Sequence, residues 1–196
     1  MRVVALVLAA GEGRRIGGPK ALLRTGGTTF LAHASALLAR PDVASVVAVL
    51  GAEADRVRAE AGLPQGVAVV VNERWREGML SSLLAGLEAA ETLGAEAVLV
   101  HPVDHPGVDP ATIDRVVEAL LRGAAIAVPS WQGRRGHPGG FAQPTWKALR
   151  AAPAARGARA VLEDHPDWVA HVAGDPWCTA GIDTPDDLER WNRRRR

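Results

Sequence analysis

Short apolar segments alternate with longer segments of mixed polarity along most of the chain. Runs rich in valine, alanine and leucine predict buried strands at 3–8, 44–50, 66–71, 95–100, 124–128 and 168–172. Regularly spaced apolar residues predict helices at 28–38, 52–61, 78–93, 110–121, 144–150, 156–163 and 185–191. The alternation indicates an α/β fold of three layers (α/β/α), in which helices cover both faces of a mostly parallel sheet.

The polar positions between these segments mark where elements begin and end. Asp109 followed by Pro110 is a helix cap with proline in the first turn, which predicts a helix start there. Residues 72–77 and the glycine-rich stretch 131–140 are predicted loops. Because no long linker or repeat divides the chain, we expect one domain over residues 1–192 and a basic tail at 193–196.

The composition of the chain disfavours several classes of protein. The chain has 196 residues and a formal net charge of +1, so it lacks the global basic field that binding to nucleic acid favours. Its single cysteine, Cys178, cannot form a disulfide within the chain, which fits a reducing compartment. No stretch approaches a signal peptide or the apolar length of a membrane helix. We therefore expect a cytoplasmic protein that does not bind membranes.

A loop of glycines and basic residues directly follows the first predicted strand. Glycine lets backbone N–H groups turn toward a ligand without a side-chain clash, and consecutive N–H groups form a concave site for anions. The glycines and the basic side chains among them are Gly11, Gly13, Gly17, Gly18, Arg14, Arg15 and Lys20. The stretch thus predicts a phosphate-binding loop, in which Lys20 follows the conformationally restricted Pro19.

Two common nucleotide-binding motifs are absent from this loop. It contains no GxxxxGK[ST] sequence, and the third glycine of a dinucleotide fingerprint is replaced by Ile16. A dinucleotide-dependent dehydrogenase is therefore disfavoured.

Asp104 follows the fourth predicted strand and lies between Pro102 and Pro106. Ligands in open α/β sheets bind at the carboxyl ends of strands, so Asp104 and the glycine loop should face one crevice. A carboxylate there is suited to a divalent cation, although an aspartate after a strand also serves as a turn residue.

The loop closely resembles that of nucleotidyltransferases that make nucleoside-diphosphate sugars and related compounds. More narrowly, the chain resembles the molybdenum cofactor cytidylyltransferase group of the molybdopterin nucleotidyltransferase-like families. The matching segments are Leu8-Ala9-Ala10-Gly11-x-Gly13-x-Arg15-Ile16-Gly17-x-x-Lys20, Gly78-Met79-Leu80-Ser81-Ser82-Leu83, Pro102-Val103-Asp104-His105-Pro106, Gly136-His137-Pro138, Gly157-Ala158-Arg159 and Ile182-Asp183-Thr184-Pro185-Asp186-Asp187-Leu188. The resemblance implies a Rossmann-like, GT-A-like nucleotidyltransferase fold.

The resemblance also implies transfer of a nucleoside monophosphate from an NTP to a phosphorylated acceptor, with Mg²⁺ and release of pyrophosphate. Arg15, Lys20 and Asp104 would be catalytic, Asp104 and Asp183 would hold the metal, and His137 would contact the acceptor. The nucleotide would be bound by Leu8, Ala9, Ala10, Gly11, Gly13, Arg15, Lys20, Ser82 and Asp104.

Several of these residues have a simpler interpretation. Ser82 can cap a helix, His137 can be a surface residue, and Asp183 can begin the last helix. Members of the family more often carry Asp-x-Asp before Thr-Pro, whereas Gly181 stands first here. A zinc site at His101 and His105 is disfavoured, because the expected metal is hard and bound to phosphate. Trp75, Trp131 and Trp146 are expected to pack in the core or at its rim.

The resemblance also favours a particular nucleotide and a particular acceptor. Ala10 precedes Gly11, and its methyl group would crowd a purine, which favours CTP over GTP. The Gly-His-Pro and Gly-Ala-Arg segments favour molybdopterin as the acceptor, with a molybdoenzyme as a possible partner. Two alternatives stay open: a cytidylyl-, uridylyl- or guanylyltransferase for another phosphorylated small molecule, and a non-catalytic protein that binds nucleotide or cofactor for a molybdoenzyme.

Overall fold

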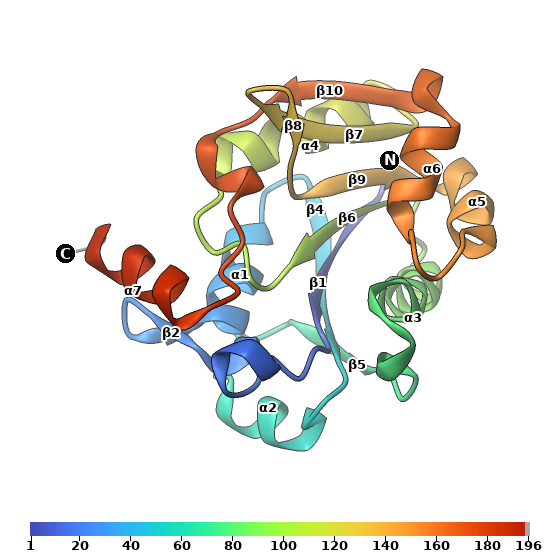
Figure 1. Ribbon diagram of the computed structural model, residues 1–196. Helices are drawn as coiled ribbons and strands as arrows, with labels where there is room; N and C mark the ends of the chain where they lie inside the picture. Colours follow the sequence, from blue (N-terminus) through green and yellow to red (C-terminus); the bar gives the residue numbers. More distant parts are fainter. Residues whose placement is uncertain (195–196) are drawn as a thin grey trace.

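The computed structural model describes residues 1–194, which fold around one mixed sheet (Figure 1). The strand order is β10-β7-β9-β6-β1-β4-β5, and β8 pairs with β7. The strands are β1 (Val3–Ala9), β4 (Val43–Leu50), β5 (Ala68–Val71), β6 (Ala97–Pro102), β7 (Ile126–Trp131), β8 (Arg134–Arg135), β9 (Gly139–Ala142) and β10 (Val169–Ala173). A separate small hairpin pairs β2 (Arg24–Thr25) with β3 (Thr28–Thr29).

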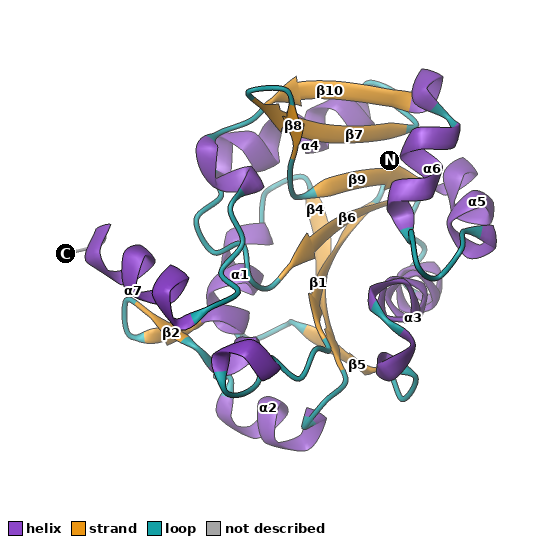
Figure 2. Ribbon diagram, in the orientation of Figure 1, coloured by secondary structure: helices purple, strands orange, loops and turns teal. Residues whose placement is uncertain are grey.

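Helices cover both faces of the sheet, as the sequence predicted (Figure 2). They are α1 (Phe30–Leu38), α2 (Ala54–Glu60), α3 (Met79–Thr92), α4 (Pro110–Leu121), α5 (Trp146–Ala151), α6 (Ala158–Asp164) and α7 (Pro185–Arg194). The four strands β1, β4, β5 and β6 are parallel to one another. The predicted three-layer α/β fold with a mostly parallel sheet is confirmed.

Side chains of the central strand β1 alternate between two cores. Every residue of β1 is buried, because helices lie on both sides of it. Val3, Ala5 and Val7 pack in a core that includes residues of α1 and α4. Val4, Leu6 and Leu8 pack in the opposite core, against residues of α3, α5 and α6. This arrangement leaves the carboxyl ends of β1 and β6 as neighbours at one edge.

The prediction of a loop over 131–140 was wrong. The segment contains β8 and the start of β9, and β9 lies antiparallel between β6 and β7. A Cβ atom at Gly140 would lie 2.7 Å from Leu120 Cδ1, so only glycine lets this strand approach α4 so closely. Because Gly139 and Gly140 are poor strand formers, composition concealed the strand.

The last helix is longer than the sequence predicted. It continues to Arg194, so the first two residues of the predicted basic tail are helical, while 195–196 lie outside the described residues. The Trp191 indole nitrogen donates to Thr25 Oγ1 at 2.9 Å, which fixes α7 against the β2–β3 hairpin. No helix in the described part of the chain combines the length and apolar character needed to cross a bilayer.

Candidate active site

The loop after β1 folds back on itself around Gly13. The carbonyl of Gly13 accepts hydrogen bonds from the backbone N–H groups of Ile16 and Gly18, at 3.0 and 3.2 Å. Gly13 has a φ of 65°, and a Cβ atom there would lie 1.9 Å from the Gly18 oxygen. Only glycine permits this turn. A Cβ atom built at Gly11 would have no neighbour within 4 Å, so the backbone of Gly11 is accessible to a ligand.

The turn brings Lys20 against two carboxylates from distant parts of the chain. Lys20 Nζ donates to Asp104 Oδ2 at 2.6 Å and to Asp183 Oδ1 at 2.5 Å. Arg15 Nη2 reaches the same Asp183 oxygen at 2.9 Å. The Lys20 and Asp104 side chains are only 16% and 23% exposed, whereas Arg15 extends into solvent. The glycine loop and Asp104 therefore lie side by side, joined by Lys20.

Backbone hydrogen bonds hold these segments in place. The Val103 N–H donates to the Leu8 carbonyl at 3.1 Å, which ties the end of β6 to the end of β1. The Ile182 N–H donates to the Asp104 carbonyl at 2.9 Å, so the chain before α7 runs beside Asp104. Asp183 is the next residue, and this contact brings it to the site.

A cap at the start of α7 fixes Asp183 further. Asp187 Oδ2 accepts from the backbone N–H groups of Asp183 and Thr184, and Thr184 Oγ1 in turn accepts from the Asp187 N–H. The Thr184 hydroxyl also donates to Asp187 Oδ2 at 2.7 Å, and this bond, together with the two backbone N–H donors, lowers the pKa of Asp187 to about 2. Thr184 and Asp187 thus form the start of the helix, and the Asp183 side chain pairs with Lys20 instead.

The site is a compact set of opposite charges. Burial lowers the pKa of Lys20, but the charges and hydrogen bonds of Asp104 and Asp183 outweigh it, so the net pKa is raised. The hydrogen bond from Lys20 lowers the pKa of Asp183, against the smaller opposing effect of burial. Lys20 and Asp183 are therefore ionised at neutral pH, and with Asp104 they form a polar centre that can exchange partners with a charged ligand.

The donor set fits a hard divalent cation. Asp104 Oδ1 is buried and has no hydrogen-bond partner, and both aspartates converge on one cationic group, the Lys20 ammonium. Within residues 1–194, no three His, Cys, Asp or Glu side chains are grouped closely enough to hold a cation. Two carboxylates supplemented by substrate phosphate and water are a usual set for Mg²⁺.

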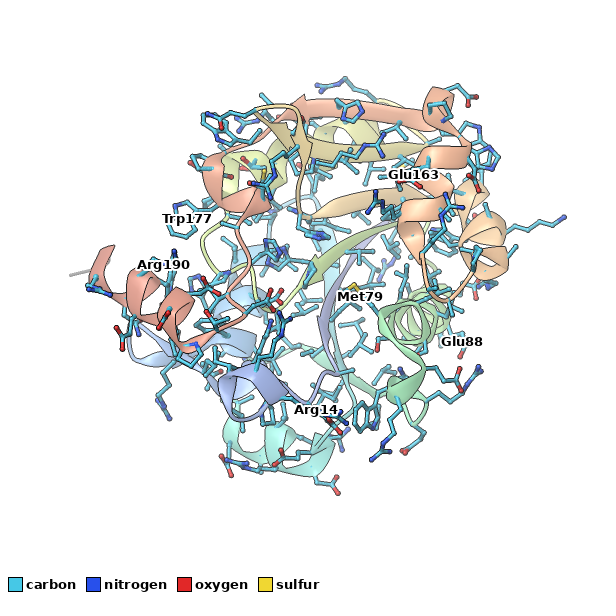
Figure 3. All side chains as sticks on the ribbon, in the orientation of Figure 1. Arg14, Met79, Glu88, Glu163, Trp177 and Arg190 are labelled. Carbon is cyan, nitrogen blue, oxygen red and sulfur yellow. The ribbon has the colours of Figure 1, made fainter. Side chains whose placement is uncertain are left out.

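A cavity of about 990 Å³ opens beside this centre, and it reaches the ends of β1 and β6 at Leu8 and Pro102. Its apolar wall comes from both the sheet and the helices: Leu8, Leu80, Leu83, Val100, Val128 and Phe141. Four arginines also line it: Arg134, Arg135, Arg156 and Arg159. Met79 of α3 and Glu163 of α6, labelled in Figure 3, line the same space.

His137, which the resemblance predicts to contact the acceptor, lies on the wall of the cavity. Its backbone N–H donates to the Cys178 carbonyl at 2.8 Å. Its ring packs edge-on against that of His105, with 4.8 Å between the ring centroids. Burial and the neighbouring His105 lower the pKa of His137 to about 4, although Asp104 opposes them. The ring is therefore neutral at neutral pH and can both donate and accept a hydrogen bond.

Ser82 is not brought to the cavity wall. It is buried at 4% exposure, and its hydroxyl oxygen accepts from Asn72 Nδ2 at 3.0 Å. Asn72 also donates to Ser81 Oγ at 2.9 Å and accepts from the Arg74 N–H at 3.0 Å. Asn72 thus organises the loop between β5 and α3. Sequence reasoning missed this residue, although an apolar strand followed directly by asparagine was visible. The prediction that this strand is buried was wrong, because β5 is the partly exposed edge strand of the sheet.

Ala10 packs on the other side of the glycine loop. Its carbonyl accepts from the Ala52 N–H at 3.0 Å. A Cβ atom at Gly51 would lie 2.7 Å from the Ala10 methyl group and 2.6 Å from Trp75 Cβ. Leu8 and Ala9 are buried as well. Trp146 is a core residue, since it is 1% exposed and donates to the Phe141 carbonyl.

Comparison with known proteins places this chain in a family. A family described as the MobA-like NTP transferase domain matches residues 5–171. The chain belongs to the MobA-like NTP transferase domain family. The resemblance inferred from the motifs is thereby confirmed at the level of the family, which includes nucleotidyltransferases.

Relatives within and around the family carry different names. Nicotine blue oxidoreductase of Paenarthrobacter nicotinovorans is 41% identical over 143 residues, which cover 69% of each chain. Molybdenum cofactor guanylyltransferase of Cereibacter sphaeroides is 36% identical over 140 residues, covering 70% of this chain and 67% of that one. The bifunctional enzyme IspD/IspF of Rhizorhabdus wittichii is 40% identical over 135 residues, but the match covers only 33% of its length.

The fold also matches solved structures over nearly its full length. Rv0371c from Mycobacterium tuberculosis H37Rv superposes with a TM-score of 0.85, at 28% identity, over 98% of both chains. A structure of the same protein in complex with manganese gives a TM-score of 0.78.

Proposed function

We propose that this protein transfers a nucleoside monophosphate, CMP from CTP, to a phosphorylated acceptor and releases pyrophosphate. The favoured acceptor is molybdopterin or the molybdenum cofactor. The observation that carries the proposal is the contact of Lys20 with both Asp104 and Asp183, between a glycine loop and an arginine-lined cavity. Residues 1–192 act in this proposal as one nucleotidyltransferase domain.

The triphosphate binds at the glycine loop. The open backbone at Gly11 and the turn at Gly13 present N–H groups, while Arg15 and Lys20 supply positive charge for phosphate oxygens. Lys20 can turn from its carboxylates to phosphate oxygens, because both kinds of partner are anionic and lie within reach of one flexible ammonium. The buried residues Leu8, Ala9 and Ala10 form the floor of this subsite.

Asp104 and Asp183 hold Mg²⁺ in this proposal. Asp104 would contribute its buried Oδ1 atom, which has no hydrogen-bond partner, and Asp183 would contribute the carboxylate that pairs with Lys20. The bound cation supplies positive charge that offsets the charge developing on the triphosphate. An acceptor phosphate is already ionised, so the protein needs no strong general base. Its task is to hold the acceptor phosphate in line with the α-phosphorus and to exclude water.

The acceptor occupies the cavity in our proposal. Its apolar wall suits the flat body of a pterin, and the four arginines suit anionic groups. Neutral His137 can hydrogen-bond the acceptor without adding charge. The name of the molybdenum cofactor guanylyltransferase relative supports this acceptor. A molybdoenzyme that takes up the finished cofactor is the corresponding partner.

A panel of nucleotides and acceptors tests the proposal. CTP, UTP, GTP and ATP are each combined with molybdopterin or with small sugar and alcohol phosphates, in Mg²⁺, and pyrophosphate is measured. We expect release with CTP and molybdopterin. Release only with another pair identifies the alternative transferase and contradicts our assignment. Nucleotide binding without turnover in any pair supports the accessory-protein alternative, and NADH or NADPH consumption without pyrophosphate indicates oxidoreductase chemistry.

A further inference from the structure

The His105 ring lies close to Asp104, to Gly181 and to His137, a residue of the cavity wall. Its Nε2 atom is 3.8 Å from Asp104 Oδ1, and the side chain is only 13% exposed. The opposite side of the ring meets His137, which lines the cavity. None of the roles assigned above uses this imidazole.

The backbone conformation at position 181 does not require glycine, but the nearby His105 ring leaves little room for a side chain there. Unlike Gly13, Gly181 does not adopt a positive φ, so its backbone would accept any residue. A Cβ atom there would instead lie 3.3 Å from His105 Nε2, and 3.7 and 3.9 Å from two carbons of the same ring. A side chain at position 181 would therefore press against the imidazole, and one of the two groups would have to shift.

That space adjoins the oxygen of Asp104 that has no partner. Asp104 Oδ2 is held by Lys20, whereas Oδ1 is buried without a hydrogen bond. The 3.8 Å from Asp104 Oδ1 to His105 Nε2 is too long for a hydrogen bond, so the ring can act on the carboxylate only by packing beside it. Lys20 holds Oδ2 by a hydrogen bond, and His105 is the neighbour of Oδ1.

We propose that His105 is a positioning residue that holds Asp104 Oδ1 toward a divalent cation and fills the space left free by Gly181. The cation itself rests on the proposed function, but the pairing of residues 105 and 181 does not. Groups next to a metal ligand commonly change metal affinity by about 10- to 100-fold when removed, since they orient the ligand.

A second-site rescue tests this proposal. Mn²⁺ is used as the probe, and its affinity for the whole protein is measured by electron paramagnetic resonance without nucleotide. His105→Ala should weaken Mn²⁺ binding about 10-fold, because Asp104 loses its support. Gly181→Asp alone should weaken it as well, because the new side chain collides with His105. The double variant should bind within about threefold of wild type, because the new carboxylate then has room beside Asp104.

Matched variants separate positioning from loss of fold. His171→Ala, on exposed strand β10, should leave Mn²⁺ affinity unchanged. Gly181→Ala introduces only the Cβ atom and should weaken binding less than Gly181→Asp, which keeps the test usable if the aspartate variant unfolds. The proposal is overturned if folded His105→Ala binds Mn²⁺ like wild type, if the double variant binds no better than the single variants, or if the wild-type protein binds no Mn²⁺. Because turnover is not measured, failure of the transferase assignment would appear separately, in the pyrophosphate assay.

Discussion

Lys20 Nζ lies 2.6 Å from Asp104 Oδ2, although 84 positions separate the two residues in the sequence. The contact exists because β1 and β6 are parallel neighbours, so the loops at their carboxyl ends meet. The same ammonium reaches Asp183, which is brought in by the chain preceding α7. One lysine thus occupies the region between two carboxylates that suit a cation, and this relationship can be tested directly.

Lys20→Met should weaken use of the NTP by about 10-fold or more, because hydrogen bonds to charged groups contribute roughly 1.5–3 kcal/mol. The same change should leave Mn²⁺ affinity unchanged or tighter, since no ammonium then competes for Asp104 and Asp183. Steady-state kinetics and Mn²⁺ titration measure the two effects. Lys147→Met, at an exposed position of α5, is the matched control. Wild-type kinetics in Lys20→Met would make Lys20 a bystander.

Ala10→Gly should move nucleotide preference from CTP toward GTP. Removal of the methyl group that crowds a purine should change the ratio of kcat/KM values by about 10-fold, a usual effect of one carbon in a pocket. Competition between CTP and GTP in the pyrophosphate assay measures the ratio. An unchanged ratio would show that Ala10 does not select the base.

Asn72→Ala should destabilise the fold by about 1–3 kcal/mol, because it removes buried hydrogen bonds to Ser81 and Ser82. If the loop before α3 contacts the nucleotide, the KM for NTP should rise while the KM for the acceptor stays constant. Urea unfolding and kinetics measure these effects, with exposed Ser45→Ala as the control. Equal changes in both KM values would indicate a general loss of structure.

The buried histidines predict acid sensitivity below pH 6.5. The pKa of His137 is about 4 in the folded protein and near 6.5 in the unfolded chain, so the unfolded state binds more protons between these values. Stability should therefore fall as the pH drops from 6.5 to 4. His101 and His105, whose pKa values burial also lowers, act in the same direction.

Urea midpoints at pH 7, 5.5 and 4.5 measure this effect. His137→Gln should lose less stability than wild type over the same range, because one titrating ring is absent. Since the hydrogen bond from Lys20 lowers the pKa of Asp183, that carboxylate does not account for the loss in this window. A constant wild-type midpoint from pH 7 to 4.5 would contradict the account.

The sequence contained much of this architecture, for identifiable reasons. Strands such as β1 are apolar on both faces, so periodicity and composition agree, and the rule for strand ends then placed Asp104 opposite the glycine loop. Strand β9 was missed because it begins with two glycines, of which Gly140 packs closely against Leu120 and Val116 of α4. The separation of Ser82 from the cavity depends on hydrogen bonds to Asn72, which no motif encodes. The close approach of Gly181 to the His105 ring likewise results from the folded structure and follows from no sequence motif.

Pyrophosphate release from CTP and molybdopterin, compared between wild type and Asp104→Asn, tests the central claim most directly. Asparagine keeps the size of Asp104 but removes its charge, so the variant should fold normally by circular dichroism. We predict that wild type releases pyrophosphate only when CTP, acceptor and Mg²⁺ are all present, and that Asp104→Asn loses at least about 100-fold in rate, as expected when a group that stabilises the transition state is removed. Near-normal turnover in the folded variant would contradict this account of the site.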